Sequence, residues 1–179
     1  MEITETELAG LFVLRPTAHR DPRGLFTRTF DAALARAHGM ELGPDCQDSQ
    51  SRSAPGVLRG MHGRGGAGEA KLVRCASGAV WDIVVDARPG SPTLGRHHAM
   101  RLDDTDFAAL WIPPGFLHGF QVIGERAADV CYRIDRPHDP AEDIAVAWDD
   151  PDLALPWREQ PRLISERDAA AGPWASLRG

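Results

Sequence analysis

Short apolar and β-branched segments recur along the whole chain, separated by glycine, proline and aspartate. The clearest are GLFVL, GVLRGMH, KLVRCA, AVWDIVVDA, ALWIPPG, HGFQVIG and ADVCYRI. Segments of this length between turn residues are typical of β-strands, and they do not alternate with long helices as a parallel sheet would require. The spacing therefore predicts an antiparallel all-β fold, either a sandwich or a barrel.

Helical signals are few. Asp31 is a predicted N-cap and Gly39 a predicted stop for DAALARAHG, and Ser165 is a second predicted N-cap in SERDAAAG. The chain has 179 residues, of which 42% are hydrophobic, and it contains no internal repeat, linker or low-complexity segment. We therefore expect residues 1–179 to form one domain with a sizeable core.

Charge, hydropathy and cysteine usage narrow the class of protein. A net charge of −6 argues against nucleic acid as a partner, although it is compatible with a local basic pocket for one small anion. No apolar run approaches the ~20 residues that cross a bilayer, so no membrane partner is expected. The three cysteines lie far apart without a CxxC pair, and the N-terminus is acidic where a signal peptide is basic. These features favour a cytoplasmic protein.

Strand alternation places polar residues on faces that are otherwise apolar. A period of two puts Asp82 on an aliphatic face of segment 80–86 and Tyr132 on an aliphatic face of segment 129–134. In GVLRGMHGR, Arg59 and His62 would point to opposite faces unless a bulge at Gly60 redirects them. A buried polar group without a partner costs roughly 2–7 kcal/mol, so several such groups together indicate a site.

Taken singly, each of these residues also has a purely structural interpretation. His62 and Tyr132 fit hydrogen-bonded core residues. Asp168 fits the first turn of a short helix, and Lys71 and Arg59 fit surface charges. Only their combination favours a functional site.

Eight sequence blocks together resemble one family. They are RGLF, QDSQSRS, GVLRGMH, AKLVRCASGAVWDIVVDARPGSPTLG, LWIPPGFLHGF, DVCYRIDRPHDPAED, WDDPDLALPW and ISERDAAAG. In order and spacing, residues 10–172 resemble the dTDP-4-dehydrorhamnose 3,5-epimerase family. The resemblance implies a cupin-type jelly roll and a homodimer that exchanges N-terminal strands. It also implies inversion of carbons next to the 4-keto group of a nucleoside-diphosphate deoxysugar, with no metal or other cofactor.

The same resemblance assigns catalytic roles. His62 matches the base that removes the proton next to the ketone, and Asp168 matches its carboxylate partner. Tyr132 matches the acid that returns a proton from the opposite face, which inverts the carbon. Lys71 matches a substrate contact that offsets negative charge on the keto oxygen, and His118 is expected to assist it.

Further positions match the family's substrate contacts. Asp82 is expected to orient His118 from the neighbouring strand, and Arg59 is expected to grip the diphosphate in a bidentate manner. The other matching positions are Arg23, Phe26, Arg28, Gln47, Ser49, Asp143 and Arg167. Of these, Arg23 and Phe26 are expected to come from the partner subunit.

Departures from the family leave the exact substrate open. Arg28 stands where the family often has an acidic residue, Ser49 replaces a usual Asn, and Asp143 replaces a usual Glu. The nucleobase therefore stays open between dTDP, CDP and GDP. His138 replaces a second tyrosine, so inversion at C3, C5 or both stays open, as does the choice between rhamnose and a secondary-metabolite deoxysugar. The loop GRGGAGEA is shorter and richer in glycine than is usual.

Two other functions fit part of the sequence. PPGFLHGF, which contains His118, supplies half of the ligand pattern of a metal-dependent cupin dioxygenase or isomerase. The other half needs two histidines separated by one residue, whereas His97 and His98 are adjacent. A non-catalytic module that binds sugar nucleotides is the second alternative, although the residues that match the base, its partner and the acid are all present.

Overall fold

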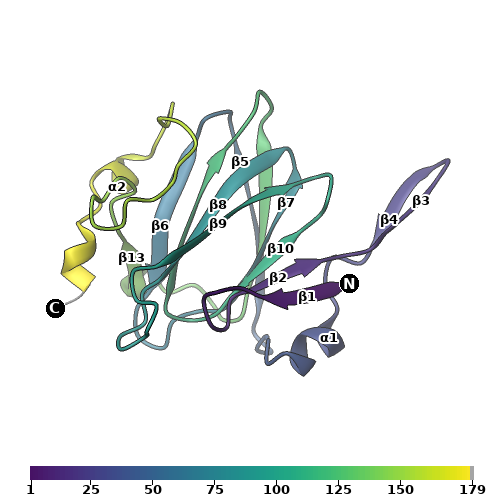
Figure 1. Cartoon of the computed structure of the whole chain (residues 1–179), viewed down its shortest axis with the longest axis horizontal. Coiled ribbons are helices and arrows are strands. Elements are labelled where there is room, and N and C mark those ends of the chain that lie inside the picture. The colour runs from purple at the N-terminus through teal and green to yellow at the C-terminus, as the bar shows by residue number, and fades with distance from the viewer. Residues whose placement is uncertain (178–179) are drawn as a thin grey trace.

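Two antiparallel sheets pack face to face in the computed structural model, which describes residues 1–177 (Figure 1). The six-stranded sheet has the order β1 (Glu2–Glu5), β2 (Phe12–Arg15), β10 (Ala109–Ile112), β7 (Lys71–Ser77), β12 (Ala128–Ile134) and β5 (Gln47–Ser53). The five-stranded sheet has the order β13 (Asp143–Ala145), β6 (Leu58–Arg64), β11 (Phe116–Val122), β8 (Ala79–Asp86) and β9 (His97–Asp103). The predicted all-β fold is confirmed.

The remaining elements are short. They are the hairpin strands β3 (Ala18–Asp21) and β4 (Gly24–Thr27), the helices α1 (Ala32–Ala37) and α2 (Glu166–Ala169), and the 3-10 helices η1 (Pro140–Glu142) and η2 (Trp174–Leu177). Asp31 Oδ1 accepts hydrogen bonds from two backbone N–H groups of α1, and Ser165 Oγ accepts one from α2, which confirms both predicted N-caps. Within residues 1–177, no helix has the length and apolar character needed to cross a membrane.

The main core fills the space between the two sheets. Val84 of β8, Phe120 of β11 and Val130 of β12 are all fully or almost fully buried there. On the other face of β8, Ile83 packs in a second cluster with Trp174 of the C-terminal segment, which lies beside β6 and β13 in Figure 1. Because β8 is covered on both faces, the polar residues on its core side are shielded from water.

The N-terminal strands pair in two ways. β1 pairs with β2, and β2 pairs with β10 of the same chain, so these strands complete their own sheet. The β3–β4 hairpin instead pairs only within itself and projects away from the body of the chain (Figure 1). Of the described N-terminal strands, β3 and β4 are therefore the two that join neither large sheet.

Candidate active site

A pocket of about 300 Å³ is lined by residues from both sheets. Its lining consists of Ser51, Arg59, His62, Gly63, Arg64, Glu69, Lys71, His118, Phe120, Tyr132, Ile134, His138, Asp143 and Arg167. Seven of these are site residues that the sequence predicts. The imidazole of His62 and the phenol of Tyr132, which the sequence expectation places on two sides of a ligand, lie in the walls of the same pocket.

A bulge in β6 brings two of these side chains together. His62 pairs with His118, but Arg59 pairs with Phe120, so two residues of β6 oppose one residue of β11. Gly60 has a φ of +138°, and a Cβ there would lie 2.6 Å from a backbone Cα of β11. This register shift confirms the predicted bulge. As a result, Arg59 and His62 both line the pocket although they are three residues apart.

His62 is held by a buried carboxylate. Its Nε2 lies 2.6 Å from Asp168 Oδ1, and Asp168 Oδ2 accepts a hydrogen bond of 3.2 Å from the backbone N–H of Gly60. Burial alone raises the pKa of Asp168, but the hydrogen bond and charge of His62 and the Gly60 N–H outweigh it and lower that pKa. The carboxylate therefore supports the imidazole, while Ser165 Oγ caps the helix by accepting from the Asp168 backbone N–H.

A second histidine has the same kind of support. His118 Nε2 lies 2.9 Å from Asp82 Oδ2 on the neighbouring strand β8, and both side chains are buried. Asp82 thus orients His118 as the sequence predicts. His118 lines the pocket and Asp82 does not. The His118 ring meets the Tyr132 ring edge-on, with centroids 6.4 Å apart.

Tyr132 presents a protonated phenol to the pocket. Burial is the main cause that raises its pKa to about 12, and the charge of Asp82 adds to this effect. A hydrogen bond with Ser51 Oγ at 3.3 Å and the charge of Arg59 act in the opposite direction. Around neutral pH, the phenol therefore has a proton to donate.

Lys71 lies at the start of β7 as part of a buried ionic cluster. Its Nζ lies 2.9 Å from Glu69 Oε1, and Glu69 Oε2 lies 3.0 Å from Arg64 Nε. Arg64 also donates a hydrogen bond to the backbone carbonyl of Pro137. Sequence reasoning predicts Lys71 but misses Glu69 and Arg64, which it treats as part of a glycine-rich loop.

A second polar cluster lines the pocket next to η1. Asp143 accepts one contact of 3.1 Å from His138 Nε2 and another of 3.0 Å from Arg167 Nη2. Gln47, a predicted substrate contact, is exposed at the start of β5, where its side-chain oxygen accepts a hydrogen bond from the backbone N–H of His138. The cluster thus unites Asp143 and Arg167 with His138, whereas Gln47 is outside the pocket lining.

Two further predicted substrate contacts, Arg59 and Ser49, lie in different cavities. Arg59 Nε donates a hydrogen bond to Ser53 Oγ at 2.9 Å and leaves the rest of its guanidinium for the pocket. Ser49 pairs with Tyr132 across β5 and β12, but it lines a separate cavity of about 150 Å³ with Phe30. Ser49 is therefore outside the lining of the main pocket, and its role as a substrate contact stays a prediction.

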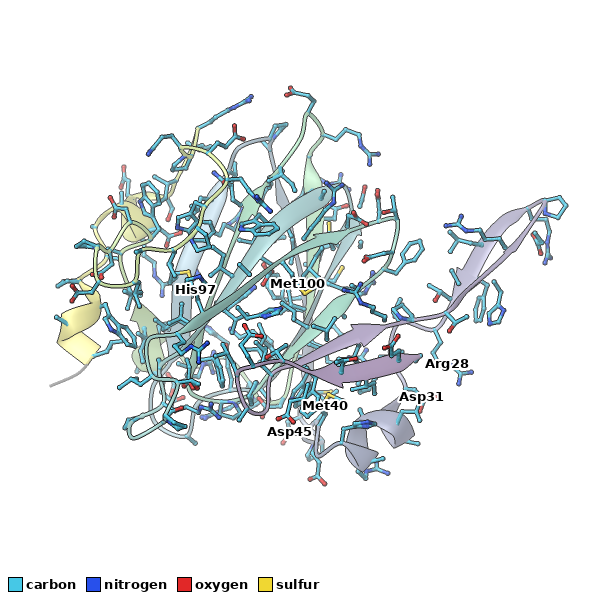
Figure 2. The ribbon with its side chains drawn as sticks, in the orientation of Figure 1. Arg28, Asp31, Met40, Asp45, His97 and Met100 are labelled. Carbon is cyan, nitrogen blue, oxygen red and sulfur yellow. The ribbon has the colours of Figure 1, made fainter. Side chains whose placement is uncertain are left out.

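Three predicted contacts belong to the hairpin region. Arg23 pairs with Asp21 at the hairpin tip, and Phe26 is 69% exposed. Arg28 follows β4 and forms an ion pair of 3.0 Å with Asp31 (Figure 2). None of these three side chains lines the pocket of its own chain.

The donor set of the metal-dependent alternative is not assembled. Across residues 1–177, no three His, Cys, Asp or Glu side chains gather in a group that could hold a metal ion. His118 is bonded to Asp82 instead. His97 and His98 lie on β9, where Figure 2 labels His97 and where His98 contacts Glu7.

The arrangement of these groups indicates the class of protein. Two imidazole–carboxylate pairs and a phenol can remove and return protons within one shielded pocket. An all-β sandwich with such a pocket defines a cupin-like epimerase.

Comparisons with known proteins identify the family. The sequence profile of the family described as dTDP-4-dehydrorhamnose 3,5-epimerase matches residues 5–176. The chain belongs to this family and is an isomerase of the racemase and epimerase group that acts on carbohydrates.

Individual relatives cover nearly the whole chain. The dTDP-4-dehydrorhamnose 3,5-epimerase of Escherichia coli K12 is 36% identical, over 92% of this chain and 89% of that protein. NovW, a 4-keto-6-deoxy sugar epimerase from the novobiocin cluster of Streptomyces spheroides, is 37% identical, with a TM-score of 0.94 over 99% of this chain and 89% of that chain. ChmJ, a 3′-monoepimerase of Streptomyces bikiniensis solved with dTDP-quinovose, is 30% identical, with a TM-score of 0.88 over 97% of this chain and 88% of that chain. The cupin-like jelly roll is confirmed.

Proposed function

We propose that the protein inverts C3, C5 or both in a nucleoside-diphosphate 4-keto-6-deoxyhexose, with a dTDP-linked sugar as the first candidate. The observation that carries this proposal is the presence of the His62–Asp168 pair and the Tyr132 phenol in one pocket. The solved ChmJ complex, which contains a dTDP-linked sugar, supports the choice of nucleotide. The free cysteines Cys46, Cys75 and Cys131 are consistent with a cytoplasmic location.

The proposed reaction begins with proton removal. Asp168 engages His62 Nε2 and stabilises the charged ring, so His62 Nδ1 is the atom that takes the proton from the carbon next to the ketone. The electron pair of the broken C–H bond moves to the keto oxygen, where the Lys71 ammonium and the His118 ring offset the negative charge. Tyr132 then donates its proton to the same carbon from the opposite side.

A solved structure of a ChmJ variant supports the roles of His62 and Tyr132. A ChmJ double variant solved with dTDP replaces a histidine by asparagine and a tyrosine by phenylalanine. The two replaced positions are separated by 70 positions, as are His62 and Tyr132. We therefore assign the acid–base pair of this chain to His62 and Tyr132.

The charges around the pocket suit a diphosphate. The lining contains four cationic side chains and two carboxylates. The cations are Arg59, Arg64, Lys71 and Arg167, and the carboxylates are Glu69 and Asp143. This local excess of positive charge contrasts with the net charge of −6 of the whole chain. Arg59 is proposed as the main diphosphate contact, because a guanidinium can bind two phosphate oxygens at once.

Deuterium labelling tests this proposal directly. The protein would be incubated in deuterium oxide with 4-keto-6-deoxyglucose linked to dTDP, CDP or GDP, and NMR would locate the label. We expect label at C3, C5 or both for the dTDP sugar. Binding without any exchange would identify a non-catalytic module, and exchange that a chelator abolishes would support the metal-dependent alternative. The labelled carbon also shows whether the protein, which has His138 in place of a second tyrosine, inverts one carbon or two.

We further propose that the active unit is a homodimer in which each β3–β4 hairpin completes the pocket of the other subunit. The hairpin carries Arg23 and the exposed ring of Phe26, and it has no partner strand outside itself among the described strands. An exposed apolar ring on a projecting hairpin fits a contact that a second copy covers.

Mixed dimers test the exchange. His62→Ala chains and Arg23→Ala/Phe26→Ala chains are each expected to be inactive as pure dimers. In a mixed dimer, one of the two pockets combines an intact body with an intact hairpin. Random pairing of equal amounts makes about half of the dimers mixed, so the mixture should recover about a quarter of the activity of the unmodified protein. Mass spectrometry of intact dimers would count the mixed species. Mixed dimers without recovered activity, or a monomeric active protein, would contradict the exchange.

A further inference from the structure

Lysine occurs once in this chain. Of the 20 basic residues counted as lysine or arginine, Lys71 is the sole lysine and the other positions are arginine. Its side chain is 9% exposed, and it lies in the pocket wall next to the proposed acid–base pair. An ammonium is a compact charge on a flexible stem with three donors, whereas a guanidinium is a rigid fork. The single ammonium of the chain's side chains therefore lies in the pocket wall.

The residue that contacts this ammonium is held by its own turn. Gly66 and Gly68 adopt positive φ angles of 59° and 70°, and the N–H of Gly68 donates to the carbonyl of Gly65 at 2.9 Å. Ala70 then exchanges backbone and side-chain hydrogen bonds of 2.9 and 3.0 Å with Asp135. Glu69 lies between these two fixed points, so its backbone has little freedom.

Glu69 divides its carboxylate between two cations. One oxygen lies 2.9 Å from Lys71 Nζ and the other lies 3.0 Å from Arg64 Nε, and the carboxylate is only 9% exposed. Removal of this carboxylate would leave two buried cations facing each other without a counter-charge. Lys71 and Glu69 both line the pocket, so the ion pair holds the ammonium at the pocket wall.

We propose that Glu69 is a positioning residue for the epimerisation, which fixes the Lys71 ammonium at the pocket wall through one oxygen and Arg64 through the other. This rests on the proposed function, since it takes the ammonium to face the keto oxygen of the substrate. A fixed ammonium stabilises developing negative charge better than a mobile one, because no reorganisation is needed during the reaction.

Kinetics of Glu69→Gln provide the first test. The amide keeps the size of the side chain but removes the charge, and we expect kcat to fall at least about tenfold while KM changes less than about threefold. The matched control is Glu142→Gln, which removes a carboxylate that pairs with Arg136 outside the pocket lining and should leave kcat unchanged. If Glu69→Gln does not fold, the Arg64→Gln/Glu69→Gln double variant keeps the net charge and should show the same loss of kcat.

The single lysine allows a test that needs no turnover. In protein labelled with ¹⁵N-lysine, one Nζ resonance is expected, and its hydrogens should exchange slowly with water while Glu69 holds them. Glu69→Gln should broaden this resonance and speed acylation of Lys71 by an amine-reactive reagent, whereas Glu142→Gln should not. An unchanged resonance and acylation rate in Glu69→Gln would overturn the positioning role, even if activity falls. If the unchanged protein labels no substrate carbon, the proposed function fails, and the Nζ data still decide whether Glu69 holds Lys71.

Discussion

The His62→Ala variant is expected to lose deuterium exchange at the substrate carbons next to the ketone by roughly 10²–10⁴-fold, the usual contribution of a positioned base. The physical reason is that the His62 ring lines the pocket and has the buried Asp168 carboxylate 2.6 Å from its Nε2, which stabilises the charged ring after it takes the proton. Exchange at C3 and C5 would be followed by NMR in deuterium oxide. Loss of exchange at both carbons should accompany loss of inversion.

The control for this variant is His97→Ala. His97 lies on β9 and is not part of the pocket lining, so its replacement should leave exchange unchanged (Figure 2). If His62→Ala keeps normal exchange, His62 is not the base. His138, which has its own carboxylate partner in Asp143 at 3.1 Å, would then be the next histidine to replace.

Apolar segments predicted seven of the thirteen strands in the described residues, and β5 shows how a strand can be missed. All seven predicted segments contain strands, because each one carries buried side chains that mark it in the sequence. β5 was not predicted as a strand, since most of its residues are exposed and polar. Its structure comes from pairing with β12 along its whole length, from Gln47 to Ser53, which is a long-range contact that a local pattern does not reveal.

Site contacts could be predicted where the local backbone determines which side chains lie side by side. The glycine at position 60 predicted the bulge that joins Arg59 and His62, and strand neighbourhood predicted that Asp82 orients His118. Glu69 was missed because a glutamate in a glycine-rich loop normally faces water. Two features of the sequence pointed to it: the sole lysine two positions later, and the apolar residues that follow that lysine into β7.

The hairpin contacts could not be derived from one chain. Arg23 and Phe26 belong to the segment that projects farthest from the body in Figure 1. Their proposed place in a pocket needs a second subunit, and neither local propensity nor the register of a single sheet carries information on such a contact. The family resemblance alone supplied the expectation.

The Tyr132→Phe variant is expected to reduce inversion more than proton removal. Phenylalanine keeps the ring that packs against the core but lacks the O–H group, so His62 can still take a proton while the opposite face has no donor. We expect the rate of inversion to fall by roughly 10²-fold or more. Exchange of the carbon-bound hydrogen for deuterium should persist, because His62 can return a deuteron to the face from which it took the proton. NMR of the sugar would measure both quantities in one sample, since inversion changes ring couplings and exchange removes the proton signal.

The state of the phenol can be measured separately, because Tyr132 is the sole tyrosine of the chain. An ordinary phenol ionises with a pKa of about 10, whereas burial raises the pKa of Tyr132 to about 12. Phenolate absorbance of the folded protein should therefore stay low between these two values and rise only above them, while unfolded protein ionises earlier. A phenolate signal near neutral pH, or equal losses of exchange and inversion in Tyr132→Phe, would contradict the role of a proton donor facing His62.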